Sequence, residues 1–424
     1  MLPLLLPLLL WAGGCAANST ESWLARRAAM IDAVYGAGPG VLPTRSEPDA
    51  VISWPEEPGL QGHVWNISNG LFPINSTVFY KPIRPGARAK SAVLYHHGHG
   101  NCVCPTKAGD APIDAAKCRP GCRAGPHAVT YDEARLQALY GGFSWWDRNN
   151  VTRFFHALGH DIFILSMPLK GVNLGPGSNA SHLETSHWWF LQWERRGDAA
   201  LRYFLEPVYL TVNWAKRHGY EKIIMAGLSG GGWTTTAASA LDPRIDASFP
   251  IAGSIPCALR NPESWVAGQN WTGNSDEDFE QSCRPNATDP HPDRTGPECG
   301  RQGAPCPDAQ PGRALYAACN YTCQYLLAGL EPNRFQVQVL HEYDTCCFSP
   351  HGRHDKMLEY EANIRAELMT DGRASRGHGW FTTTADNHSK HEIAAQDRTI
   401  VANALRLSPA PGAAAWEQLP CDIM

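Results

Sequence analysis

The run from Lys222 to Trp233 contains a serine in a context typical of a catalytic nucleophile. It is K-I-I-M-A-G-L-S-G-G-G-W, so Gly227, Ser229 and Gly231 complete the pattern G-x-S-x-G. The apolar residues before Gly227 predict a buried strand, and the alanine-rich stretch after Trp233 predicts a helix. A sharp turn between them would expose the hydroxyl and would need small residues on either side of it. We therefore predict that Ser229 is an activated nucleophile.

Such a serine needs a base to take its proton and a carboxylate to orient that base. Asp344 lies just past the apolar strand predicted for Phe335–Leu340, downstream of the serine. An acidic residue at the end of a late strand suits the orienting role, so we predict Asp344. Glu342, nearer the end of the strand, is the alternative carboxylate. The purely structural interpretation is that Asp344 is an ordinary turn residue.

The base should be a histidine on a loop before a late helix. His391 directly precedes the last apolar helical pattern, from about Glu392 to Leu407, and we predict that it is the base. His388 is the main alternative, although a glycan on its neighbour Asn387 would hinder it. His378 is a more distant one. The predicted order along the chain is then serine, aspartate and histidine.

Two backbone N–H groups are also needed to stabilise the oxyanion. Gly230, directly after the serine, should supply one, and the segment His97-Gly98-His99-Gly100 should supply the other, from His99 or Gly100. The histidines of this segment, with His96, could instead bind a metal. Their spacing straddles a strand end and no acidic ligand is near, so we expect neither a metal nor a cofactor.

These residues must be positioned by a larger framework of alternating strands and helices. The patterns predict an antiparallel hairpin followed by a mostly parallel sheet with helices on both faces. The predicted strands are 62–68, 74–81, 91–95, 161–167, 222–226, 247–252 and 335–341, and the predicted helices include 201–218 and 392–407. The fold class is therefore α/β.

Two polar, proline-rich stretches interrupt this rhythm, at about 101–131 and 261–311. They carry seven of the chain's fourteen cysteines, and we interpret them as disulfide-stapled insertions into one domain spanning 18–424. Cys15 belongs to the leader, which leaves an odd number of cysteines in the mature chain. Aromatic runs at 143–146 and 188–193 are either core or a wall over the serine.

The first seventeen residues are apolar and then small, which is typical of a secretory signal peptide. N-x-S/T sequons begin at nine asparagines: Asn18, Asn66, Asn75, Asn150, Asn179, Asn270, Asn286, Asn320 and Asn387. This excess predicts a secreted or lumenal glycoprotein without a stable membrane anchor. The net charge of −5 argues against nucleic acid as a partner.

The chain resembles the α/β-hydrolase superfamily over roughly Gly62 to Leu407. The resemblance rests on the motif at Ser229, the His97-Gly98 segment and the order of Ser229, Asp344 and His391. The stretch G-L-S-G-G-G-W-T-T, together with the later L-D-P-R-I-D, is similar to acetyl-xylan esterases and dienelactone hydrolases. The resemblance implies cofactor-free hydrolysis through an acyl-enzyme, with a small-molecule or glycan-borne ester as the substrate.

Two other functions compete with an ester hydrolase. A serine peptidase of the prolyl-oligopeptidase kind usually carries a large N-terminal domain, whereas only about sixty residues precede the first predicted strand here. A catalytically silent binding protein of the same fold usually lacks the serine or the histidine. This chain has candidates for every catalytic role, so we rank the ester hydrolase first.

Overall fold

The structure of the chain is a computed structural model. It describes residues 20–36, 40–54, 57–68, 73–98 except 85 and 87, 147, 151–169, 173, 190, 200–255, 313–344, 354–369, 380–386 and 391–407. The predicted signal peptide and both predicted cysteine-rich insertions lie outside these ranges. None of the helices in these ranges combines the length and the hydrophobicity of a membrane-spanning segment.

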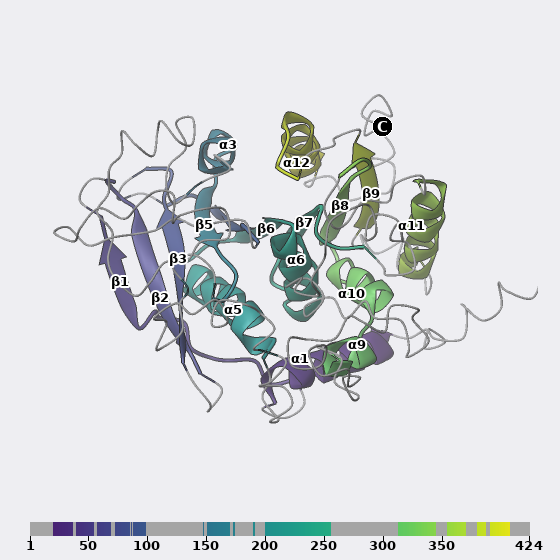
Figure 1. Cartoon of the computed structure of the whole chain (residues 1–424), viewed down its shortest axis with the longest axis horizontal. Helices are drawn as coiled ribbons and strands as arrows, with labels where there is room; N and C mark the ends of the chain where they lie inside the picture. Colours follow the sequence, from purple (N-terminus) through teal and green to yellow (C-terminus); the bar gives the residue numbers. More distant parts are fainter. Residues whose placement is uncertain are drawn as a thin grey trace, which may run out of the picture.

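A nine-stranded sheet forms the centre of the described structure (Figure 1). Its strands are β1 (Ala50–Ser53), β2 (Gln61–Ile67), β3 (Ile74–Lys81), β4 (Ser91–His96), β5 (Asp161–Leu165), β6 (Lys222–Leu228), β7 (Ala247–Ile251), β8 (Phe335–His341) and β9 (Trp380–Asp386). Their spatial order is β1-β2-β3-β5-β4-β6-β7-β8-β9. The pairs up to β3–β5 are antiparallel and all later pairs are parallel. The predicted mostly parallel sheet is therefore confirmed.

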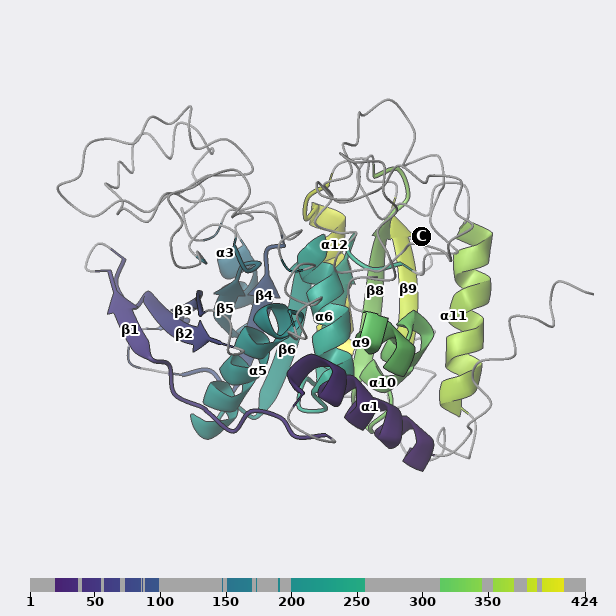
Figure 2. The same ribbon diagram turned by 60° about the horizontal axis from the view of Figure 1, so that its bottom comes forward.

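Helices cover both faces of this sheet (Figures 1 and 2). Alternate residues of a buried parallel strand point to opposite faces. Accordingly, Ile223 and Met225 of β6 join one core, and Ile224 and Ala226 join the other. The larger core includes side chains of α1 (Thr20–Tyr35), α5 (Arg202–Arg217), α6 (Gly230–Leu241), α9 (Arg313–Ala318), α10 (Tyr321–Ala328) and α11 (His354–Met369). The smaller one includes side chains of α3 (Val151–Ala157) and α12 (Ala395–Leu407).

Most predicted elements agree with the structure to within a few residues. The predicted hairpin is the antiparallel pair β2–β3, in which Asn66 lies opposite Asn75. The strand predicted from Phe335 has the predicted bounds, and β6 continues two residues beyond Ala226, up to the serine. The helix predicted after Trp233 starts earlier, at Gly230. Strands β1 and β9 and helices α1, α3, α9, α10 and α11 were not predicted.

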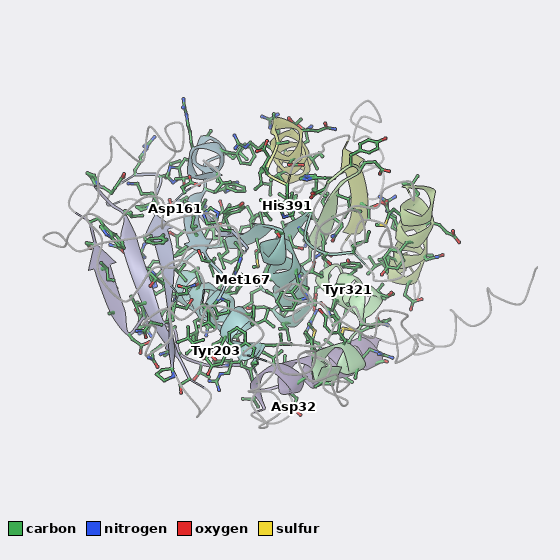
Figure 3. All side chains as sticks on the ribbon, viewed as in Figure 1. Asp32, Asp161, Met167, Tyr203, Tyr321 and His391 are labelled. Carbon is green, nitrogen blue, oxygen red and sulfur yellow. A yellow bond between two sulfur atoms is a disulfide. The ribbon has the colours of Figure 1, made fainter. Side chains whose placement is uncertain are left out.

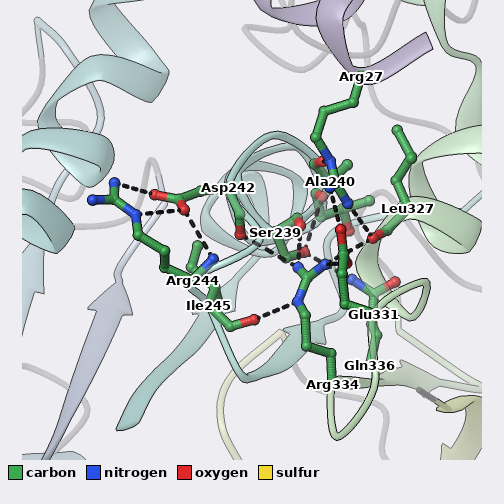
Figure 4. A network of polar contacts seen from close by, with 11 residues as sticks. Arg27, Ser239, Ala240, Asp242, Arg244, Ile245, Leu327, Glu331, Arg334 and Gln336 are labelled. Atoms are coloured by element: carbon green, nitrogen blue, oxygen red, sulfur yellow. Dashed lines mark hydrogen bonds and ion pairs between the residues drawn. The ribbon is translucent and has the colours of Figure 1, made fainter. Parts of the chain in front are cut away.

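A buried network of arginines joins α1 to the amino ends of the later strands (Figure 4). Arg27 of α1 donates hydrogen bonds to Ala240 O at 2.8 Å and to Leu327 O at 3.0 Å. Arg334, just before β8, also donates to Leu327 O, and Glu331 pairs with both arginines. Burial lowers the pKa of Arg334, although the charge of Glu331 opposes this shift. The network therefore joins α1 to the carboxyl ends of α6 and α10 and to the turn before β8.

Candidate active site

Ser229 occupies a strained turn between β6 and α6. Its backbone has φ 59° and ψ −131°, a conformation that residues other than glycine rarely adopt. The strand ends at Leu228 and the helix begins at Gly230, so the turn consists of the serine alone. This is the strand, sharp turn and helix that the sequence predicted.

The glycines of the motif are required by close backbone packing. A Cβ atom at Gly227 would lie 2.2 Å from Gly231 O, and one at Gly231 would lie 2.1 Å from His96 O. A Cβ at Gly253, after β7, would lie 2.0 Å from Ser229 O. Real Cβ contacts are essentially never this short, so α6, the end of β4 and the segment after β7 approach the turn at distances that only glycine allows.

The loop after β4 packs directly against this turn. Gly98 has φ +73°, and a Cβ there would lie 2.5 Å from Leu228 O and 3.2 Å from Gly230 N. The N–H of Gly98 donates to Nδ1 of His96 at 3.1 Å, which fixes that ring nitrogen as an acceptor. The loop predicted to face Gly230 therefore does so. His99 and Gly100, its next two residues, lie outside the described residues.

Asp344 and His391 are brought together from separate segments. Asp344 ends a turn after β8, in which its N–H donates to His341 O at 3.2 Å. His391, labelled in Figure 3, lies just before α12. Its Nδ1 is 2.6 Å from Asp344 Oδ2, and the carboxylate side chain is fully buried. The Asp344 and His391 that the sequence singled out therefore form a hydrogen-bonded pair.

The other ring nitrogen of His391 is unoccupied within the described part of the chain. Nε2 of His391 is buried and has no hydrogen-bond partner there. Because Nδ1 donates to a carboxylate, the neutral ring carries its lone pair on Nε2. A nitrogen in this state can accept a proton from a hydroxyl. The alternatives His388 and His378 lie outside the described residues.

Parallel packing places Ser229 and the Asp344–His391 pair at the same end of the sheet. Strands β6, β7 and β8 are consecutive parallel neighbours, so their carboxyl ends share one edge of the sheet. Ser229 follows β6 and Asp344 follows β8 at this edge. In open α/β sheets this is where ligands bind.

Two other sequence features can be placed in part. Phe190, in the second aromatic run, is fully buried and packs against Tyr203 and Phe204, with ring centroids 5.6 and 5.0 Å apart. For this residue the core interpretation is confirmed. One disulfide is seen in the described residues, Cys319–Cys323, at the start of α10.

A second histidine–aspartate pair lies behind the first and was not predicted. His341 is the last residue of β8, and its Nε2 is 3.2 Å from both carboxylate oxygens of Asp397 in α12. The sequence contained one signal for Asp397, because an acidic residue three positions after a helix start often caps that helix. Nothing in the sequence linked it to His341.

The parallel sheet and the turn at Ser229 together define an α/β-hydrolase fold. No protein-family model matches the chain, and no curated protein does. An acetyl xylan esterase from a Paenibacillus species is similar in structure, with 13% identity, a TM-score of 0.45, and 93% of this chain and 96% of that chain covered.

Two further solved structures are similar to a comparable degree. An acetyl xylan esterase from a Thermoanaerobacterium species has 9% identity and a TM-score of 0.44, covering 90% of this chain and 92% of that chain. A family 15 glucuronoyl esterase from Caldicellulosiruptor kristjansonii has 14% identity and a TM-score of 0.44, covering 91% and 84%.

Proposed function

We propose that this protein is a serine hydrolase that cleaves carboxylic esters through an acyl-enzyme. Ser229 is the nucleophile, His391 the base and then the acid, and Asp344 the group that orients His391. The observation that carries the proposal is the 2.6 Å contact between His391 Nδ1 and Asp344 Oδ2, with Nε2 of the same ring left available. This is the tautomer and the orientation that a general base needs.

The proposed reaction has two half-reactions. Oγ of Ser229 attacks the carbonyl carbon while its proton passes to Nε2 of His391. The alcohol then leaves with that proton, and the acyl group stays on the serine. A water molecule, deprotonated by the same nitrogen, attacks the acyl-enzyme, and the carboxylic acid is released as the proton returns to Ser229.

Negative charge on the carbonyl oxygen would be stabilised by backbone N–H groups. Gly230 opens α6, and the first N–H groups of a helix have no partner within it. The second donor in this proposal is the N–H of His99, directly after Gly98, which itself packs against the turn. Gly230 belongs to the closely packed turn at Ser229, so this donor needs no reorganisation during the reaction.

Labelling with a fluorophosphonate probe tests the proposal. We expect wild-type protein to be labelled covalently and Ser229→Ala not to be labelled. Ser91→Ala is the matched control, because Ser91 starts β4 at the opposite end of the sheet and should not react. A panel of esters graded by acyl length, with the corresponding amides, would then identify the substrate class. Folded wild-type protein that resists the probe would exclude the proposal.

The substrate in this proposal is a small-molecule or glycan-borne ester, and the protein acts as a secreted glycoprotein. Of the nine sequons, those at Asn66, Asn75 and Asn320 start at exposed residues of the described structure. The disulfide Cys319–Cys323 suits an oxidising compartment. Treatment with an N-glycosidase tests glycosylation. The mass of wild-type protein should fall, and the mass of a variant in which all nine asparagines are replaced by Gln should not change.

A further inference from the structure

The pair formed by His341 and Asp397 is buried directly behind the Asp344–His391 pair. Both side chains of the second pair are inaccessible to solvent, and Nε2 of His341 is equidistant, at 3.2 Å, from the two oxygens of Asp397. A buried carboxylate and imidazole are costly unless they satisfy each other. The two residues are 56 positions apart, so the pair joins distant segments.

The second ring nitrogen of His341 faces the first pair. Its Nδ1 lies 3.8 Å from Oδ2 of Asp344, the same oxygen that contacts His391. A neutral ring carries one N–H and one lone pair, so it would direct a lone pair at one of the two carboxylates. An imidazolium carries a positive charge that both carboxylates attract, at 3.2 Å through Nε2 and at 3.8 Å, beyond hydrogen-bond distance, through Nδ1. The geometry therefore favours a charged His341 between Asp344 and Asp397.

Asp397 also fixes the segment that carries His391. Its Oδ2 accepts the N–H of Ala394 at 2.6 Å, as the third residue of a helix does in a capping box. This contact defines the start of α12, a few residues after His391. The backbone oxygen of His341 accepts a hydrogen bond from the N–H of Asp344. The pair thus ties the turn holding Asp344 to the helix start that follows His391.

We propose that His341 and Asp397 are positioning residues for the Asp344–His391 couple. They hold the turn that carries Asp344 and the segment that carries His391 in a fixed relative position, and they place a positive charge beside Asp344. This inference rests on the proposed function. Besides the four members of the cluster, the ionisable residues on these segments are Glu342, Tyr343, Glu392 and Arg398, and Asp386 of β9 is opposite His341 in the strand register. The charge of Arg398 acts on Asp147, which caps α3.

The test measures the rate of fluorophosphonate labelling between pH 5 and pH 9. In His341→Gln the positive charge is lost, so Asp344 holds the proton of His391 more tightly. We expect a rate at least about tenfold lower and an acidic midpoint higher by about half a pH unit or more. Asp397→Asn removes the counter-charge of His341 but keeps an oxygen for Ala394, so it should shift the midpoint in the same direction.

The double variant and a control complete the design. If the pair acts as a unit, the double variant is no slower than the slower single variant. His156→Gln, which changes a half-buried histidine in α3, should match wild type in rate and midpoint. A lower labelling rate with an unchanged midpoint in both single variants would show that the pair serves fold stability alone, and this would overturn the inference. Single variants with the rate and midpoint of wild type would overturn it too. Wild-type protein that is not labelled would overturn the proposed function as well.

Discussion

Oδ2 of Asp344 lies 2.6 Å from Nδ1 of His391, although the two residues are 47 positions apart in the chain. The contact is short, and the carboxylate is buried while the imidazole is 24% exposed. The aspartate is therefore shielded from water, and part of the imidazole faces solvent although its Nε2 is buried. Because the carboxylate holds Nδ1, Nε2 is the nitrogen through which this ring can exchange a proton.

Replacing Asp344 by Asn should impair the proposed reaction without unfolding the protein. The amide has the shape of the carboxylate but can present an N–H to Nδ1, which favours the wrong tautomer of His391. We expect the labelling rate, and kcat on any ester found, to fall by about 10³- to 10⁴-fold. Glu342→Gln tests the alternative carboxylate and should keep activity within about threefold. A larger loss of activity in Glu342→Gln than in Asp344→Asn would assign the orienting role to Glu342.

Adding one methyl group at Gly231 should be far more damaging than adding one at Gly219. A Cβ at Gly231 would lie 2.1 Å from His96 O and 2.8 Å from Gly98 N, both backbone atoms that cannot move aside. Gly219 has φ +87° but nothing within 4 Å of the added atom. We expect Gly219→Ala to cost about 1 kcal/mol, and Gly231→Ala at least about 3 kcal/mol. Urea unfolding of both variants checks the difference, and equal costs would contradict it.

Stability should fall as the pH drops from about 6.5, because His63 is buried in neutral form. Burial, and then the charge of His218, lower the pKa of His63 from 6.5 to about 4. Between these two values the unfolded chain binds a proton that the folded chain does not, so acid favours unfolding. The contribution is roughly 2 kcal/mol at pH 5.

Urea unfolding at pH 7 and pH 5 measures this effect in wild type and in His63→Gln. The variant should lose less stability between the two pH values. Some loss should remain, because burial and then the charge of Lys222 lower the pKa of His160 to about 4 as well. A variant with the full wild-type pH dependence would show that His63 is not the group responsible.

The sequence predicted the elements that have a strong local pattern. The strand from Phe335 to His341 is almost wholly apolar or alternating, and the motif at Ser229 marks its own turn, so both were located within a few residues. Strand β9 was missed because its T-T-T-A-D core has little apolar character and depends on pairing with β8. Helix α1 was missed because charged residues interrupt its apolar pattern.

The candidate site divides in the same way. Ser229, Asp344 and His391 could be chosen because each has a fixed relation to a neighbouring element, the end of a strand or the start of a helix. The pair of His341 and Asp397 could not, because it depends on how the end of β8 meets α12 in space. Contacts between distant segments leave no local pattern, and only the three-dimensional structure shows them.

The buried arginine network also sets an order of events during synthesis. Arg27 is made early, yet its partner Glu331 follows 304 residues later. At 5 to 20 residues per second, the ribosome needs roughly 15 to 60 s to cover that distance. Throughout that interval Arg27 lacks Glu331, its ion-pair partner in the described structure. The contacts of α1 with α9, α10 and the turn before β8 must therefore form late, although α1 itself is made before the sheet.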